Sequence, residues 1–316
     1  MSSDPASRPA PAPVQTILSV LGSPYLLLSF AILCWGGNFV VGRLANLDVP
    51  PVALSFWRHL LATLLILPFA LPGLRRDWGA IRANFGMVAF LSALFVTGNT
   101  VVYFAVLNTT ITNAALINAG VPVAAAFFSW LILRDLINRW QAMGIALCFL
   151  GIAVVVTRSD LGLLLRLQLN WGDLFMLLAV LCWALYMVLL KRAHMGISPL
   201  SVLFVLAAGG TLWLVPAYGI EIATGATMAW TGLTALSILY VALFSTIVAW
   251  ACWNFGTLRI GPNRASAFMS LHPVFGAALG MIFFGEVLHA YHFYGTVLVL
   301  AGLFLVSRLY RSGTKA

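Results

Sequence analysis

The chain has 316 residues, of which 62% are hydrophobic and only 8% charged, and its mean hydropathy is +1.01. So few polar side chains cannot cover the surface of a water-soluble protein of this length, which excludes a soluble globular domain. The formal net charge of +9 is explained better by basic residues that set the orientation of a membrane protein than by nucleic-acid binding. We therefore expect a polytopic membrane protein whose partners are lipid and a small molecule, with no nucleic acid.

Residues 1–23 contain four prolines among alanine and serine, and no apolar run follows a basic start. This composition predicts a mobile tail rather than a signal peptide. A membrane-spanning helix needs about 20 apolar residues, whereas a barrel strand needs about 10 in strict alternation. The runs that follow fit the helix, with turn signals at Pro72-Gly73 and Gly261-Pro262 and a loop expected over Tyr218–Thr231. We predict an all-α protein with ten transmembrane helices, at 24–44, 52–72, 83–106, 111–133, 139–157, 171–192, 199–217, 232–256, 262–284 and 290–310.

The sequence also repeats itself without gaps over long stretches, which indicates duplication. Five spans per half give an odd number of crossings, so the second half must run through the membrane in the opposite sense. We expect two inverted five-helix repeats (5+5), at 24–157 and 171–310, joined by a linker at 158–170 and followed by a tail at 311–316. Inverted repeats are typical of secondary transporters that work by alternating access. Adding 151 relates Ala114 to Ala265, Pro122 to Pro273, Asp135 to Glu286, Gly144 to Gly295 and Gly151 to Gly302, and adding 148 relates Cys34-Trp35 to Cys182-Trp183 and Pro51 to Pro199.

The basic residues lie mainly in the segments that share the side of the N-terminus. The other side holds only Arg43, Arg158 and Arg166. By the positive-inside rule both termini are therefore expected to be cytoplasmic. Arg58 lies within a span, and we expect its side chain to extend to the outer water, with contact to a substrate carboxylate as the alternative.

The paired proline spans around Pro122 and Pro273, the acidic turns at Asp135 and Glu286, and the glycines of the fifth and tenth spans resemble the drug/metabolite transporter (DMT) superfamily, EamA type. Within it, the aromatic-rich spans are most similar to aromatic amino-acid exporters of the YddG type. The resemblance covers the membrane portion from about Pro24 to Tyr310. It implies a ten-helix inverted-repeat fold in the bacterial inner (plasma) membrane and efflux of small metabolites.

Each half combines carboxamides with aromatic rings at related places along its helices. Trp35 and Asn38 are three residues apart, as are Trp183 and Tyr186, so each pair lies on one helix face. An amide facing lipid is unfavourable, and such side chains should point into the bundle or a wet cavity. Hydrogen bonding between helices with aromatic packing is the alternative. The predicted substrate-binding residues are Trp35, Asn38, Asn99, Tyr103, Asn118, Trp183, Tyr186, Trp250, Asn254 and His272.

The remaining residues argue against several classes of substrate and activity. The acids fall outside or at the edges of the spans, and the only lysines, Lys191 and Lys315, lie near the cytoplasm, which argues against a phosphate-binding cavity. Catalytic and metal-binding motifs are absent, so we predict neither an enzyme nor a cofactor or metal site. Pro122 and Pro273 each remove a backbone hydrogen bond near the middle of a span and are the predicted hinges.

We therefore predict a transporter that exports small zwitterionic metabolites, aromatic amino acids first and methionine second, by facilitated uniport. Aromatic rings suit the substrate side chain, and amides and helix ends suit its ammonium and carboxylate. The alternatives are efflux of multiple drugs or lipophilic cations, proton-coupled exchange through His272, a pore, and a membrane assembly or sensor protein. The oligomeric state stays open.

Overall fold

The computed structural model describes residues 22–46, 48–134, 139–159, 170–193, 195–261, 265 and 267–309. These residues form helices and turns, and no strand occurs among them. The first half contains α2 (Pro24–Ala45), α3 (Pro51–Ala83), α4 (Phe85–Asn108), α5 (Ile111–Asn118), α6 (Val121–Phe128), the π-helix η1 (Ser129–Leu133) and α7 (Arg139–Val156). The second contains α9 (Trp171–Ala193), α10 (Pro199–Ala223), α11 (Gly232–Tyr240), the π-helix η2 (Val241–Val248), α12 (Ala249–Ile260), the 3₁₀ helix η3 (Ala267–Ser270), α14 (Leu271–Phe284) and α15 (Ala290–Leu309).

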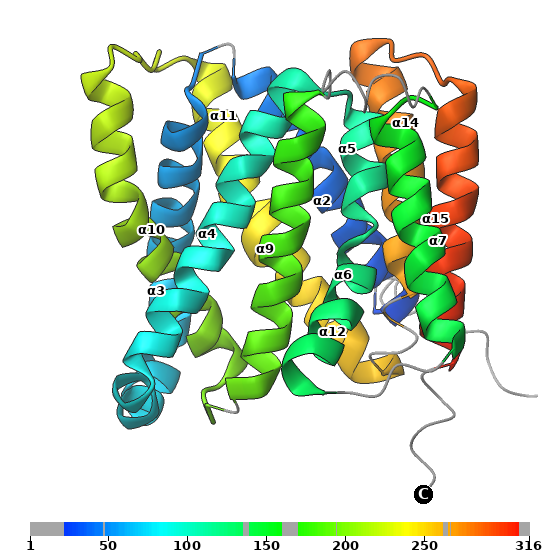
Figure 1. Ribbon diagram of the computed structural model, residues 1–316. Helices are drawn as coiled ribbons and strands as arrows, with labels where there is room; N and C mark the ends of the chain where they lie inside the picture. The colour runs from blue at the N-terminus through cyan, green and yellow to red at the C-terminus, as the bar shows by residue number, and fades with distance from the viewer. Residues whose placement is uncertain are drawn as a thin grey trace, which may run out of the picture.

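The helices run roughly parallel to one axis. In Figure 1 the α2–α3, α4–α5, α10–α11 and α14–α15 connections lie at the top, and the α3–α4 and α9–α10 connections lie at the bottom. Eight helical segments within the described residues are long and apolar enough to cross a bilayer. Two shorter apolar helices, Phe268–Phe284 and Ala290–Leu305, complete the bundle.

One expected turn and part of an expected loop are helical instead. Pro72-Gly73 lies inside α3, so the turn prediction was wrong. Tyr218–Ala223 forms the last part of α10, so the expected loop begins only at Thr224 and continues to Thr231. A proline removes only one hydrogen bond from a helix, and carboxylates near the ends of both helices stabilise these extensions, as described below. Gly261 does end α12, with a left-handed φ of 85°. Pro262, Asp135, most of the expected 1–23 tail and 158–170 linker, and the 311–316 tail lie outside the described residues.

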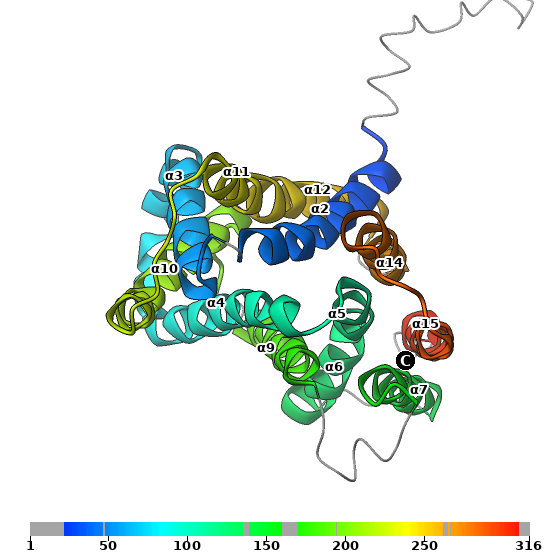
Figure 2. The same cartoon turned by 90° about the horizontal axis from the view of Figure 1, so that it is seen from above.

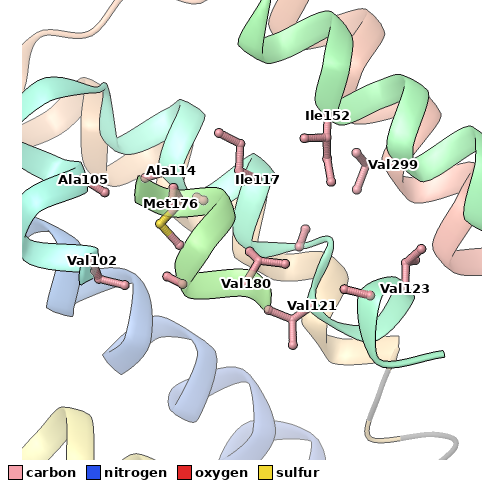
Figure 3. Close-up of a cluster of buried hydrophobic side chains, with 14 of the residues drawn as sticks. Val102, Ala105, Ala114, Ile117, Val121, Val123, Ile152, Met176, Val180 and Val299 are labelled. Carbon is pink, nitrogen blue, oxygen red and sulfur yellow. The ribbon is translucent and has the colours of Figure 1, made fainter. Parts of the chain in front are cut away.

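Seen from above, the bundle has two rows of helices. Figure 2 shows α2, α11 and α12 in one row and α4 and α9 in the facing row, with α3 and α10 at one end and α7 and α15 at the other. A cluster of buried aliphatic side chains lies among α4, α5, α6, α7, α9 and α15 and includes Val102, Ile117, Met176 and Val299 (Figure 3). Helices far apart in the sequence therefore form one core.

Glycines allow close packing between α7 and α15. A Cβ atom on Gly151 would lie 2.9 Å from the Gly295 carbonyl oxygen and 2.9 Å from Leu298 Cβ. A Cβ atom on Gly302 would lie 2.8 Å from the backbone nitrogen of Cys148. Small residues let helix backbones approach in this way in membrane proteins. Glycines of the two halves therefore lie against each other within one chain, Gly151 against Gly295 and Gly302 against Gly144.

Carboxylates near the ends of some helices form hydrogen bonds with the starts of helices that are distant in the sequence. Glu221, near the end of α10, accepts hydrogen bonds from the backbone N–H groups of Val52 (3.0 Å) and Ala53 (2.7 Å) at the start of α3. Asp77, near the end of α3, in turn accepts from the backbone N–H (2.8 Å) and hydroxyl (2.6 Å) of Ser198 at the start of α10. Free N–H groups and the helix dipole favour an anion at a helix N-terminus. The antiparallel pair α3 and α10 is thus capped reciprocally.

Glu286 makes the most extensive contact of this kind. Its carboxylate accepts from the backbone N–H groups of Ile111 (2.7 Å) and Thr112 (3.0 Å) at the start of α5, and from the Thr112 hydroxyl (2.8 Å). It also pairs with Arg43 at 3.1 Å, and its side chain is 7% exposed whereas that of Arg43 is 34% exposed. The connection between α14 and α15 is therefore fixed to α2 and α5.

We predict that Glu286→Gln lowers the thermal stability of the purified protein more than Arg43→Gln does. The glutamine amide loses one acceptor for buried backbone N–H groups, which costs about 1–3 kcal/mol. Removing a half-exposed ion-pair partner costs below about 1 kcal/mol. Melting curves in one detergent compare the two variants. An equal or larger loss in Arg43→Gln would mean that the ion pair, rather than the helix cap, stabilises this connection.

Candidate functional site

Arg58, on α3, lies inside the bundle and is 4% exposed. Its Nε donates to the Thr246 hydroxyl (2.8 Å), and its Nη1 donates to the Tyr103 hydroxyl (3.0 Å) and to Asn38 Oδ1 (3.3 Å). Its Nη2 lies 3.5 Å from the Ser245 hydroxyl. The expected extension to the outer water is wrong, because acceptors from other helices lie closer. We call these five residues the Arg58 group.

Local backbone geometry places the acceptors. Ser245 and Thr246 lie in η2, and the Thr246 hydroxyl also donates to the carbonyl of Val241, five residues earlier (2.8 Å). A π-helical turn shifts side chains relative to an α-helix and is frequent at functional sites. The ring of Tyr103 lies against α2 where Gly42 has no side chain, since a Cβ atom there would be 2.7 Å from Tyr103 Cδ1. Tyr103 then donates to Asn38, one turn away on α2, at 3.1 Å.

An aromatic group adjoins the Arg58 group. His59 follows Arg58 in α3, and its ring packs edge-on against Phe95 at 5.7 Å. Phe95 in turn contacts Trp183 (5.3 Å) and Tyr186 (5.8 Å), which also contact each other (5.7 Å). We call Phe95, Trp183 and Tyr186 the aromatic group. The aromatic group is therefore connected to Arg58 through the neighbouring residue His59.

His272 and Asn118 form a third polar contact, on the other side of α2. Asn118 Nδ2 lies 3.2 Å from His272 Nε2, and the His272 ring lies 5.3 Å from the ring of Phe39. Phe39 follows Asn38 of the Arg58 group in α2. Both residues mark helix breaks: Asn118 is the last residue of α5 and His272 the second of α14. Pro122 and Pro273 accordingly lie in the first turns of new helical segments rather than inside continuous helices.

Two buried nitrogen atoms in this region have no partner among the described residues. They are Nε2 of His59 and Nδ1 of His272, and the two histidines are 0% and 1% exposed. An unpaired buried polar group costs about 1–3 kcal/mol, so such atoms are usually satisfied by water or a ligand. They give the region capacity for further polar contacts.

The other predicted site residues, Asn99, Trp250, Asn254 and Trp35, contact backbone carbonyls or apolar side chains. The amides of Asn99 and Asn254 donate to carbonyls of their own helices, those of Phe95 and Trp250, at 2.8 Å each. Trp250 itself packs on an apolar cluster of α3, α10 and η2. Trp35 borders the Arg58 group, because its indole N–H donates to the Ser245 carbonyl (3.1 Å).

The acids are more buried than their positions in the sequence indicated. Asp173 is 0% exposed and Asp77 6%, but both lie near helix ends, and Asp173 accepts a hydrogen bond from Thr109. Among the described residues no carboxylate forms an ion pair with Arg58, and no three histidine, cysteine or acidic side chains gather where a metal ion could bind. The site is therefore cationic and otherwise built from neutral polar groups.

A bundle of apolar spans defines an integral multi-pass membrane protein. The chain belongs to the EamA-like transporter family, whose model matches it twice, at residues 22–157 and 170–308, and it is therefore a transporter rather than an enzyme. This confirms the resemblance to the drug/metabolite transporter superfamily of the EamA type.

Individual relatives are distant but align along nearly the whole chain. An uncharacterised transporter of Bacillus subtilis, YyaM, is 26% identical over 292 residues, covering 90% of this chain and 93% of that protein. A probable amino-acid metabolite efflux pump of Salmonella typhimurium is 27% identical and covers 88% and 93%. One of Escherichia coli is 25% identical and covers 89% and 93%. A solved crystal structure shares the fold with a TM-score of 0.60 at 15% identity, covering 91% of this chain and 97% of that one.

We predict that Tyr103→Phe lowers thermal stability by about 1–3 kcal/mol, because the lost hydroxyl accepts from Arg58 and donates to Asn38 in a buried region. Tyr186→Phe is the matched control, since the contacts described for Tyr186 are ring contacts. Melting of both variants in detergent tests this. A Tyr103→Phe variant as stable as the control would contradict a hydrogen-bonded Arg58 group.

Proposed function

We propose that the protein is a secondary transporter of the bacterial inner membrane that exports small zwitterionic metabolites, aromatic amino acids first and methionine second. The observation that carries this proposal is the adjacency of the Arg58 group and the aromatic group inside an apolar bundle. Hydroxyl, amide and guanidinium groups suit the charged ends of an amino acid, and the rings suit its side chain. The names of the Salmonella and Escherichia relatives support amino-acid efflux.

The charge of the site bears on the main alternative substrate. A lipophilic cation would use the rings but would approach the buried guanidinium of Arg58, and like charges repel strongly away from water. It would also leave the buried hydroxyl and amide groups unmatched. Efflux of multiple drugs or lipophilic cations is therefore the second candidate.

For the architecture we propose ten spans in two inverted repeats, 24–157 and 171–310, with both termini cytoplasmic. Residues related by the repeat have matching structures, which supports this. Pro51 and Pro199 each begin a helix. Arg134 and Gly285 each follow a helix in a left-handed conformation, with φ of 60° and 63°. The helices α3 and α10, which the repeat relates, also cap each other through Asp77 and Glu221.

For the mechanism we propose alternating access by facilitated uniport, with bending at the breaks before Pro122 and around Pro273. Helices already interrupted there reorient at lower energetic cost than continuous helices. His272 lies at one of these breaks, beside Asn118. Proton exchange through His272 is the alternative to uniport.

The substrate class is tested by protection of cells. Cells that express the protein should resist toxic analogues of aromatic amino acids and not those of branched aliphatic ones. Trp183→Ala should remove most of this resistance at equal abundance, because truncating a central aromatic contact typically costs about 2 kcal/mol or more in binding. Trp78→Ala, at an exposed tryptophan of α3, is the matched control. Equal resistance to lipophilic cations without resistance to amino-acid analogues would move the assignment to multidrug efflux.

The mechanism is tested in vesicles that contain only this protein. Labelled phenylalanine should accumulate by saturable counterflow, and Pro122→Ala should slow this exchange while Pro72→Ala, at an exposed position of α3, should not. Non-saturating flux would indicate a pore, and equal rates in the two proline variants would exclude the hinge.

An imposed pH gradient across the same vesicles should leave the flux of phenylalanine unchanged. A dependence that disappears in His272→Gln would replace uniport by proton exchange.

A further inference from the structure

Arg58 carries a positive charge that no acidic side chain of the described chain neutralises. The carboxylates of Glu221, Glu286 and Asp77 bind helix N-termini elsewhere. Asp173 and Asp48 accept from threonine hydroxyls. A charge inside a membrane bundle is unfavourable and is usually paired with an opposite charge or used for function. Here the partners are neutral oxygen atoms, which leave the net charge of the site at that of one guanidinium.

The outer nitrogen atoms of the guanidinium are only partly engaged. Nε has a short bond to Thr246 (2.8 Å) and Nη1 has one to Tyr103 (3.0 Å). The contacts of Nη1 with Asn38 and of Nη2 with Ser245 are long, at 3.3 and 3.5 Å. A guanidinium has five N–H donors, and one N–H of Nη2 has no acceptor in the described part of the chain. The planar fork suits a carboxylate, which binds through two parallel hydrogen bonds.

The surroundings fit a carboxylate attached to an apolar group. His59 follows Arg58 in α3, and its ring packs on Phe95 of the aromatic group. The unpaired Nε2 of His59 is a further polar atom beside it. A single positive charge matches a monoanion better than a dianionic phosphate, because no second cation lies among the partners of Arg58.

Resting on the proposed function, we propose that Arg58 binds the carboxylate of the transported amino acid through Nη1 and Nη2. The carboxylate oxygens replace the long contacts to Asn38 and Ser245, while Thr246 continues to hold Nε. Asn38 and Ser245 are then free to contact the substrate. The transporter selects substrates by their carboxylate, and the aromatic group contributes the preference for the side chain.

Purified wild-type protein in detergent tests this with a series of ligands that share one ring. Binding is measured by the rise in melting midpoint and by competition with labelled phenylalanine. Phenylalanine and 3-phenylpropanoate should bind, and phenylalaninamide and 2-phenylethylamine should bind roughly thirtyfold or more weakly, as expected for loss of a buried charged contact. Phenylalaninamide that binds as tightly as phenylalanine overturns the proposal without any variant.

Variants then assign the preference to Arg58. Arg58→Gln should abolish the difference between phenylalanine and its amide, and Arg58→Lys, which keeps the charge but loses the fork, should retain part of it. Arg82→Gln removes the same charge from an exposed position of the same helix and should bind as the wild type does. A monodisperse Arg58→Gln protein that still prefers the carboxylate overturns the assignment.

The outcomes separate this inference from the proposed function. Transport of phenylalanine with equal competition by its amide would keep the amino-acid exporter and reject the role of Arg58. Binding of 3-phenylpropanoate that depends on Arg58, with no amino-acid transport, would keep the carboxylate site and reject the amino-acid substrate. Binding of the amine alone would reject both.

Discussion

The fold depends on satisfying backbone N–H groups at helix ends in apolar surroundings, where an unpaired group costs several kcal/mol. Three acids meet this requirement at helices that lie far from them in the sequence. Glu221 caps α3, Asp77 caps α10 and Glu286 caps α5. Each carboxylate joins one half of the chain to the other. The same bonds that complete a helix therefore also fix how the two halves pack.

These caps have a consequence for the interior. These acids are engaged at helix ends, and no acidic side chain of the described residues pairs with the buried Arg58. Hydroxyl and amide oxygens from α2, α4 and η2 surround its guanidinium instead. Neutral partners stabilise a guanidinium without neutralising it. The bundle thus holds an electropositive point next to the rings of Phe95 and Trp183, and this combination distinguishes the site from an apolar cavity.

Much of the helical layout follows from the sequence, because apolar runs and turn residues alternate at the length of a membrane span. The ends of α2, α4, α7 and α9 fall within about two residues of the expected positions, the usual uncertainty of helix ends. The prediction of a turn at Pro72-Gly73 was wrong, because a proline in an exposed turn of α3 removes one backbone hydrogen bond without ending the helix. Local composition does not reveal that Asp77 stabilises this extension through Ser198.

The site was harder to predict. Sequence spacing predicted that Asn38 and Tyr103 face the interior of the bundle. Both contact Arg58, whose side chain was expected to extend to the outer water because Arg58 lies near the outer end of its span. Its acceptors come from residues up to 188 positions away. The apolar sequence of this segment does not predict η2, the π-helix that orients Ser245 and Thr246. Contacts between residues far apart in the sequence, and the change from α-helix to π-helix, therefore determine which groups the amide and aromatic side chains contact.

The central claim is that substrate binds between the Arg58 group and the aromatic group. The most direct measurement is an experimental structure of the full chain in lipid with phenylalanine bound. We expect the ligand carboxylate within hydrogen-bonding distance of Arg58 Nη1 and Nη2, and the ligand ring in contact with Phe95 or Trp183. A ligand bound elsewhere, or one whose ammonium rather than carboxylate lies nearest an unchanged Arg58 group, would contradict it.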